Sequence, residues 1–583
     1  MKVTLLSTLF IITSIVFSQN VDPKKANKLL KEAKGYVEVE EFIDALPILE
    51  KAYQFDPSNQ EIAYNYGKVL VITGHEARAL EPLKKAVKAE KPFDNIHFYL
   101  GVSQHVSHFF DDAVSSFDKY LGNPANAKFK ELFAEAKRRK DMCAYAKKLV
   151  ESPVNVKIRN LGPVINSKYP DYVPVISADE TTLLFTSRRD NTTGGKRDKS
   201  HNDHFMEDIY ISTRSDDTTW TTPVSVGNLI NTDDHDACAG ISPDGQKMFI
   251  YKSVKGTKKS GDLFYSELKG TVWGTPKSLG SNINSPDWEP SVSVTADENL
   301  LFFTSDRKGG LGGTDIYVSK RMPNGEYGPA KNLGSKVNTK QDDDAPFIHA
   351  DGKTLYFSSK GHNTMGGFDI FHVTVDPETG IPVSDPVNIG YPINTADDDI
   401  YFVWSADGKR AYFSSEREGG YGDKDIYVLE REIADAKLIV MRGIIKDKET
   451  GDPVSANITV VDNETQKVVG VYNSNSSTGK YTVIFPAGKN YGISVEAPHY
   501  LFYSKNIDIP NLDAFKEIKD SIKLSPIKAG NTIVLRNVFF DYNKSTLTPQ
   551  SENELMRVVK ILNLNPTLKI RISGHTDSDG NDD

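Results

Sequence analysis

The pattern of apolar and polar residues divides the chain into four parts. Residues 24–150 show the spacing of amphipathic helices, and residues 154–432 consist of short strand-like runs between turn residues. Residues 437–527 continue with longer alternating runs, and residues 528–583 combine strand-like runs with one helical run. We therefore expect a multidomain protein with a helical N-terminal part, two β-rich parts and a small α/β module.

The first 18 residues form a separate apolar segment. Lys2 is followed by an uncharged stretch that ends in Val16-Phe17-Ser18. This stretch is shorter than the roughly 20 residues that span a bilayer, and its end suits a signal peptidase. We expect residues 1–18 to be a cleaved signal peptide rather than a membrane anchor, which places the mature protein in the periplasm.

The helical part has a period of 34 residues, at which small residues recur. The recurring positions are Ala33, Gly67 and Gly101, then Ala45, Ala79 and Ala113, and finally Ala52 and Ala86. Small residues at this period allow two helices to cross closely, and the pattern resembles tetratricopeptide repeats. The resemblance implies an α-solenoid whose concave groove binds peptides or partner helices, and a plain helical spacer is the alternative.

A second repeat occupies residues 154–432. Its clearest element, Leu-Gly-x-x-Ile-Asn, ends at Asn166, Asn284 and Asn338, and looser copies end at Asn231 and Asn394. Each copy precedes an acidic cluster, a turn with aspartate, an aromatic strand and an Asp-Ile-Tyr-like strand. Five such units resemble the blades of TolB-type, WD-repeat-like propellers, so a five-bladed β-propeller is expected.

The ends of the array predict how the ring closes. The first Leu-Gly-x-x-Ile-Asn copy has no unit before it, and the fifth unit has no copy after Asp425-Ile426-Tyr427. The strand at residues 156–161 is therefore expected to complete the last blade.

Acidic clusters and cysteines offer little metal chemistry. The clusters Asp233-Asp234, 342–344 and 397–399 contain the carboxylates that calcium prefers. Their equivalent places in the repeat favour a structural role instead, in which they cap turns and accept backbone N–H bonds. Cys143 and Cys238 stand far apart in different parts and are expected to be buried thiols. We expect neither a metal nor another cofactor.

Residues 437–527 resemble the carboxypeptidase regulatory-like domain. The resemblance rests on Thr450-Gly451-Asp452-Pro453-Val454, on Thr478-Gly479-Lys480-Tyr481 and on strands at 456–461, 480–485 and 491–497. It implies a small β-sandwich. The part has no zinc-ligand or catalytic pattern, so the family name implies no peptidase activity here.

The last segment, residues 528–583, contains two specific motifs. Strands are predicted at 534–540 and 568–572, with a helix between them whose apolar face comprises Leu555, Val558, Val559 and Leu562. The motifs at 539–543 (Phe-Phe-Asp-Tyr-Asn) and 574–577 (Gly-His-Thr-Asp) resemble the C-terminal, peptidoglycan-binding module of the OmpA family.

The resemblance assigns roles to individual residues. Asp577 would pair with the ammonium group of diaminopimelate in the peptidoglycan stem, while Thr576 and Asn543 would contribute hydrogen bonds. His575 and Asp541 are expected to order the loop. The arginine-bearing helix that follows in the family is missing before Asp583, so we expect a truncated module rather than a vestigial one.

The whole chain is therefore interpreted as a non-enzymatic scaffold. A net charge of −9 and a pI near 5.8 disfavour nucleic acid as a partner, and no known catalytic motif occurs. The order of the four parts resembles PorE-type proteins of the type IX secretion machinery. We expect it to tether an outer-membrane-associated complex to peptidoglycan, with the solenoid and propeller binding proteins. The alternative is a TolB-like hub or a glycan-binding propeller.

Overall fold

The computed structural model describes residues 21–198, 203–214, 219–253, 261–431, 438–511, 515–541 and 544–574. The predicted signal peptide, residues 1–18, lies outside them. The chain forms two compact units, Met1–Lys147 and Lys148–Asp583. Within the described ranges, every helix is too short or too polar to cross a membrane.

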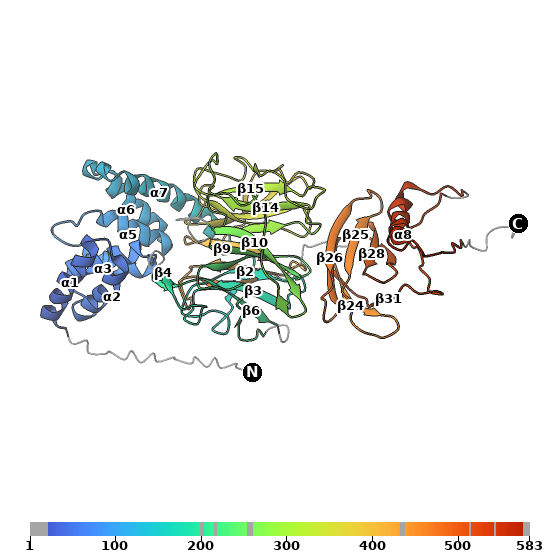
Figure 1. Ribbon diagram of the computed structural model, residues 1–583. Coiled ribbons are helices and arrows are strands. Elements are labelled where there is room, and N and C mark those ends of the chain that lie inside the picture. The colour runs from blue at the N-terminus through green and yellow to red at the C-terminus, as the bar shows by residue number, and fades with distance from the viewer. Residues whose placement is uncertain are drawn as a thin grey trace, which may run out of the picture. The chain divides into compact units, whose positions relative to one another are not determined.

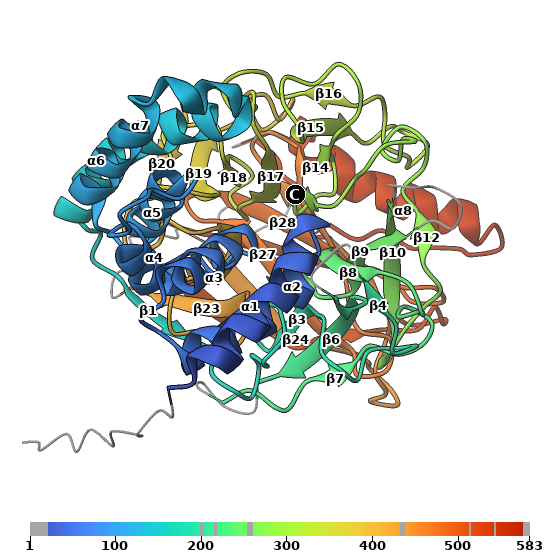
Figure 2. The same ribbon diagram turned by 90° about the vertical axis from the view of Figure 1, so that its left-hand side faces the viewer.

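The N-terminal unit consists of antiparallel helices joined by short turns (Figures 1 and 2). Its helices are α1 (Pro23–Glu38), α2 (Phe42–Phe55), α3 (Gln60–Ile72), α4 (Leu80–Ala86), α5 (Ile96–Val106), α6 (Phe110–Leu121) and α7 (Lys130–Glu151), with short 3-10 turns at Ala77–Ala79 and Pro124–Lys128. Each helix packs against the next from α1 to α6. The predicted helical N-terminal region is confirmed.

The small residues of the 34-residue period lie where these helices cross. Ala33, Ala45 and Ala79 are completely buried. Gly67 faces Leu83, and a β-carbon on Gly67 would lie 2.6 Å from the Leu83 Cγ. Gly101 faces Phe117 in the same way, at 2.7 Å from the ring. The absence of side-chain bulk at both glycines therefore sets the distance between the helices.

The second unit begins with a large β-rich region made of five successive sheets (Figure 1). The first sheet contains β2 (Asp171–Ile176), β3 (Thr182–Ser187), β6 (Asp208–Thr213) and β7 (Val224–Ser225), and the second contains β8 (Asp236–Ile241), β9 (Lys247–Ser253), β10 (Gly261–Lys269), β11 (Val272–Trp273) and β12 (Lys277–Ser278). The third contains β13 (Val292–Val294), β14 (Leu300–Ser305), β15 (Asp315–Lys320) and β16 (Lys331–Asn332), and the fourth β17 (Asp343–Ile348), β18 (Thr354–Ser359), β19 (Asp369–Thr374) and β20 (Val387–Asn388). The fifth contains β21 (Asp399–Trp404), β22 (Arg410–Ser415), β23 (Asp425–Glu430) and β1 (Lys157–Asn160), while β4 (Arg197–Asp198) and β5 (His204–Phe205) form a separate hairpin.

Each of these sheets packs against the next, and the fifth packs against the first. A buried apolar cluster lies at every junction. In chain order the clusters unite Val175 with Met248, Phe249 with Phe303, Phe302 with Phe357, Ile370 with Phe413, and Tyr412 with Phe185. The sheets thus form a closed cycle held by five similar cores.

Strand β1 comes from the N-terminal end of this region and joins the fifth sheet. It pairs antiparallel with β23, with Ile158 opposite Leu429 and Asn160 opposite Tyr427. The expected pairing of residues 156–161 with the last unit is therefore confirmed. The repeated asparagines contribute to the same contact: Asn166 accepts from the Ile426 N–H at 2.9 Å and donates to its carbonyl at 2.9 Å.

Residues 438–524 form two further sheets around one core. One sheet contains β24 (Leu438–Asp447), β27 (Lys480–Pro486), β30 (Lys516–Lys519) and β31 (Ile522–Leu524); the other contains β25 (Asn457–Asp462), β26 (Val468–Asn473), β28 (Asn490–Glu496) and β29 (Tyr503–Asp508). Met441, Ile458 and Tyr491 meet in the buried cluster between them. The predicted strands at 456–461, 480–485 and 491–497 are all formed.

The C-terminal segment differs from the prediction. A 3-10 turn, Pro549–Ser551, leads into helix α8 (Glu552–Leu564), as expected from Thr548-Pro549. Residues 534–540 and 568–572, however, form no strands. The predicted apolar face is not buried either, since Val559 is 44% exposed. A strand needs a neighbour for its backbone, and within the described ranges the isolated bridge between Phe540 and Leu547 is the only such pairing of either segment.

Candidate functional site

The residues predicted to bind peptidoglycan are Asn543, Thr576 and Asp577. All three lie outside the described residues, as does His575, so their placement stays a prediction. The described flanks of Asn543 come together: Phe540 bridges Leu547, and the Thr548 N–H donates to the Phe539 carbonyl at 3.0 Å. The Ser551 hydroxyl accepts from the Phe539 N–H at 2.8 Å, which joins this loop to the start of α8.

The buried acidic residue in α8 was not predicted from the sequence. Glu554 is completely buried, and its Oε1 accepts from the Arg536 N–H at 3.1 Å. Arg557 on the next turn lies 3.5 Å from Oε2. Asn537 donates to the Ser504 hydroxyl of β29 at 2.8 Å, which fixes the segment to the preceding sheet. A glutamate in the first helical turn was the available signal, because the helix N-terminus favours a carboxylate there.

The acidic clusters of the five-sheet region have structural roles. Asp399 accepts from the Thr395 N–H and hydroxyl at 2.6 and 2.8 Å. Asp342 and Asp398 accept backbone N–H bonds from the neighbouring loops. The interpretation of these carboxylates as turn caps is confirmed. No group of three or more His, Cys, Asp or Glu side chains within the described ranges could hold a metal ion.

A second charged cluster surrounds Glu207, directly before β6. Its carboxylate accepts from Arg188 at 3.0 Å and from His235 Nδ1 at 2.8 Å, and Tyr172 completes the group. Burial alone would raise the pKa of Glu207, but Arg188 and His235 hold that pKa well below its usual range. A carboxylate that stays ionised cannot serve as a general acid near neutral pH. The cluster therefore ties the first sheet to the second.

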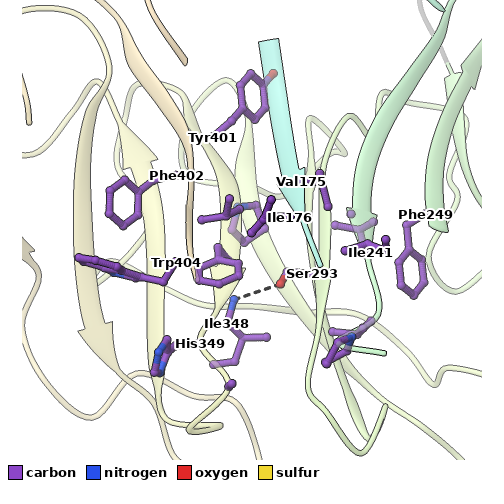
Figure 3. Close-up of a pocket in the computed structure, with 18 of the residues that line it drawn as sticks. Val175, Ile176, Ile241, Phe249, Ser293, Ile348, His349, Tyr401, Phe402 and Trp404 are labelled. Atoms are coloured by element: carbon purple, nitrogen blue, oxygen red, sulfur yellow. Dashed lines mark hydrogen bonds between the residues drawn. The ribbon is translucent and has the colours of Figure 1, made fainter. Parts of the chain in front are cut away.

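The centre of the five-sheet cycle contains an apolar cavity of about 110 Å³ (Figure 3). Phe402 and Trp404 of β21 line one side, and Ile241 and Phe249 line the other. Between them the Ser293 hydroxyl accepts from the Ile348 N–H at 3.0 Å, so this polar group is already used.

The two cysteines are free and buried, Cys143 in α7 and Cys238 in β8. Burial raises the pKa of both thiols to about 12. Since the thiolate is the reactive form, neither residue is suited to nucleophilic catalysis. The prediction of two buried thiols is confirmed.

Several solved structures are similar to parts of this chain. The first TPR of Spaghetti bound to an HSP90 peptide is 18% identical over 20% of this chain and 95% of that chain, with a TM-score of 0.18. An α-L-arabinofuranosidase from Lactobacillus brevis is 12% identical over 46% of this chain and 91% of that one, with a TM-score of 0.33. A β-xylosidase/α-arabinofuranosidase from a compost metagenome is 13% identical over 48% and 97%, with a TM-score of 0.34. At these scores the likenesses carry no argument about function.

No curated protein matches the chain. A family match exists for the C-terminal segment, where the motifs at 539–543 and 574–577 stand. Residues 539–583 match the model of the OmpA family, so the chain carries an OmpA family domain there, which implies an association with the cell envelope and its peptidoglycan.

Proposed function

We propose that this protein is a non-enzymatic envelope scaffold that binds peptidoglycan through its OmpA family segment and holds protein partners through its other parts. The observation that carries the proposal is the family match at residues 539–583. The ligand chemistry is that of the diaminopimelate stem, whose ammonium group would meet the carboxylate of Asp577. Thr576 and Asn543 would donate or accept hydrogen bonds around it.

We assign the remaining parts to the binding of protein partners. We interpret residues 24–150 as a tetratricopeptide-like solenoid, 154–432 as a five-bladed propeller and 437–527 as a regulatory-like β-sandwich. The closed cycle of five sheets, completed by β1, supports the propeller. Repeated surfaces of this kind suit protein partners, such as subunits of a type IX secretion complex.

Two features favour a scaffold over an enzyme. The carboxylate of Glu207 is held ionised by its cationic partners, so it does not act as a general acid, and the central cavity is lined mostly by apolar side chains.

The test is a pull-down with purified peptidoglycan sacculi. Asp577→Asn removes the charge and keeps the shape of the side chain. Because a charge-assisted hydrogen bond contributes ~1.5–3 kcal/mol, we expect binding to weaken about 10- to 100-fold. The measurement is the bound fraction over a series of sacculus concentrations, repeated at low and moderate salt.

Glu552→Gln is the matched control. Glu552 is an exposed acid on α8 in the same segment and lies outside both motifs, so the loss of its charge should leave binding unchanged. Equal binding by wild type and Asp577→Asn would reject the tether. If bare glycan strands then competed for binding while stem peptides did not, the glycan-binding alternative would replace it.

A further inference from the structure

The five sheets share one charged arrangement at their junctions. The innermost strand of each sheet begins at or just after a fully buried acidic residue: Asp171, Asp236, Glu289, Asp343 or Asp399. One oxygen of this carboxyl accepts an N–H and a hydroxyl from a serine or threonine four residues earlier. At Glu289 the two bonds go to different oxygens: the Ser285 N–H donates to Oε2 and the Ser285 hydroxyl to Oε1. The acid therefore fixes the turn that enters each sheet.

Four of the five acids also have a cationic partner. Arg189 lies 2.6 Å from Asp171, Arg307 lies 3.2 Å from Glu289 and Arg417 lies 2.7 Å from Asp399, while Lys252 pairs with Asp236. Each cation also donates to a backbone carbonyl of the preceding turn, as Arg417 does to Ile393 at 2.7 Å. One side chain thus neutralises the buried acid and satisfies a buried acceptor.

The fourth sheet lacks this cation. Gly361 stands two residues after the last serine of β18, where Arg189, Arg307 and Arg417 follow their own strands. A β-carbon at Gly361 would lie 1.9 Å from the Thr339 Oγ1. An arginine side chain therefore cannot fit at this position unless Thr339 moves. In the other sheets the cation contacts both the acid and a turn carbonyl, whereas here His362 contacts only the carbonyl: its Nε2 lies 2.9 Å from the Val337 oxygen.

Among the described residues, Asp343 is consequently left without a counter-charge. Its Oδ2 accepts from the Thr339 N–H and hydroxyl, and the nearby Ser359 hydroxyl offsets part of the effect of burial on the pKa of Asp343, but no donor meets the buried Oδ1 at hydrogen-bond geometry. The Asp315 carboxyl of the third sheet approaches from the other side of the junction and adds like charge. Other charged or titratable groups around this junction are Asp342, Asp344, Lys360 and His362, together with the buried Asp369, which pairs with Ser359 in the same sheet and has a pKa raised by burial.

We infer that the junction between the third and fourth sheets is a proton-linked joint, in which Asp343 takes up a proton instead of the cation that serves the other four junctions. Protonation removes the unpaired buried charge and supplies a donor at the bare oxygen. Deprotonation leaves an uncompensated carboxylate next to Asp315, which weakens the packing of β17 against β15. Burial, followed by this like charge, raises the pKa of Asp343 to about 7.

The direction in which pH changes the stability of this junction follows from the difference between the folded and unfolded pKa of Asp343. The pKa of Asp343 is higher in the folded state than the ordinary value of 3.8 in the unfolded chain. Its stabilising contribution is therefore complete below pH ~4 and is lost as the pH rises to about 7, with no further change above that. The equilibrium constant for opening should rise about 9-fold between pH 5 and 6 and about 5-fold between pH 6 and 7, where the folded carboxyl itself begins to lose its proton.

Hydrogen exchange of the full chain between pH 5 and 8 tests the joint, after correction for the intrinsic exchange rate. We expect the opening constant of β17 and β18 to rise about 50-fold from pH 5 to 7 in wild type relative to Asp343→Asn. The comparison cancels other titrating groups, including His362, whose pKa is lowered by its burial. An equal pH dependence in both proteins would overturn the inference.

Asp399→Asn provides the matched control in the fifth sheet. It leaves Arg417 buried without its acid, so it should destabilise β21 at pH 7 and 8, whereas Asp343→Asn should not destabilise β17 there. If Asp343→Asn failed to fold, wild type alone would decide: protection of β17 that did not fall between pH 5 and 7 relative to β21 would reject the joint.

Discussion

Replacing Arg159 with proline should open the cycle of five sheets at the edge of the fifth. The Leu161 N–H donates to the Ile426 carbonyl at 3.1 Å, and antiparallel pairs alternate, so the Arg159 N–H faces the carbonyl of its partner Val428. Proline removes this donor from the middle of β1 and leaves a buried acceptor unpaired. We expect a loss of about 2–4 kcal/mol. Thermal unfolding and hydrogen exchange of β23 would measure it.

Arg159→Ala separates the backbone effect from the side-chain effect. The Arg159 side chain pairs with Glu430 at 3.2 Å, but both groups are about half exposed, so this ion pair should contribute at most ~1 kcal/mol. We therefore expect alanine to change stability little. The role of β1 as the closing strand would be wrong if proline and alanine had the same small effect, or if β10 of the second sheet lost as much protection as β23.

The repeat could be predicted because five equivalent contacts require the same residues. Asn231 accepts from the Ile209 N–H at 3.0 Å and donates to its carbonyl at 2.9 Å, and Asn338 forms the same pair of bonds with Ile316. An amide side chain that accepts from the N–H and donates to the C=O of one residue cannot be replaced by a carboxylate or an aliphatic chain. The motif is therefore present in every unit, and the closing strand could be deduced because the first copy has no unit before it and the fifth unit has no copy after it.

The charges at the junctions could not be predicted in the same way. Arg189 and Arg307 follow their strands at a constant position, yet the second sheet uses Lys252 within its strand and the fourth uses none. Which cation reaches which acid depends on packing between sheets, which no local pattern reveals. The sequence identified the acids as structural but gave no indication that Asp343 differs from Asp399.

In the C-terminal segment the sequence identified the family but not all of the secondary structure. Its motifs are specific enough that residues 539–583 match a family, although the predicted strands at 534–540 and 568–572 are not formed. Local pattern measures the preference for extended backbone, whereas a strand also requires a partner. Helix α8 needs none for its backbone, and it begins at the predicted place after Thr548-Pro549.

Replacing Gly101 with alanine should force two helices of the N-terminal unit apart. The new β-carbon would lie 2.7 Å from Cε1 and 2.8 Å from Cδ1 of Phe117, whose ring is completely buried and cannot turn away. Over-packing of this kind costs about 1–3 kcal/mol, although alanine itself favours a helix by ~1 kcal/mol. We expect a net loss of stability, with faster hydrogen exchange in α5 and α6.

Gly35→Ala is the control that isolates the steric term. Gly35 lies within α1, and a β-carbon there would meet no atom within 4 Å. Only the helix propensity acts at this position, so alanine should stabilise α1 by about 0.5–1 kcal/mol. The two substitutions are chemically identical, and opposite signs would establish that close helix contact explains the small residue at Gly101. A gain of stability in both variants would reject that explanation, because helix propensity would then outweigh any contact between α5 and α6.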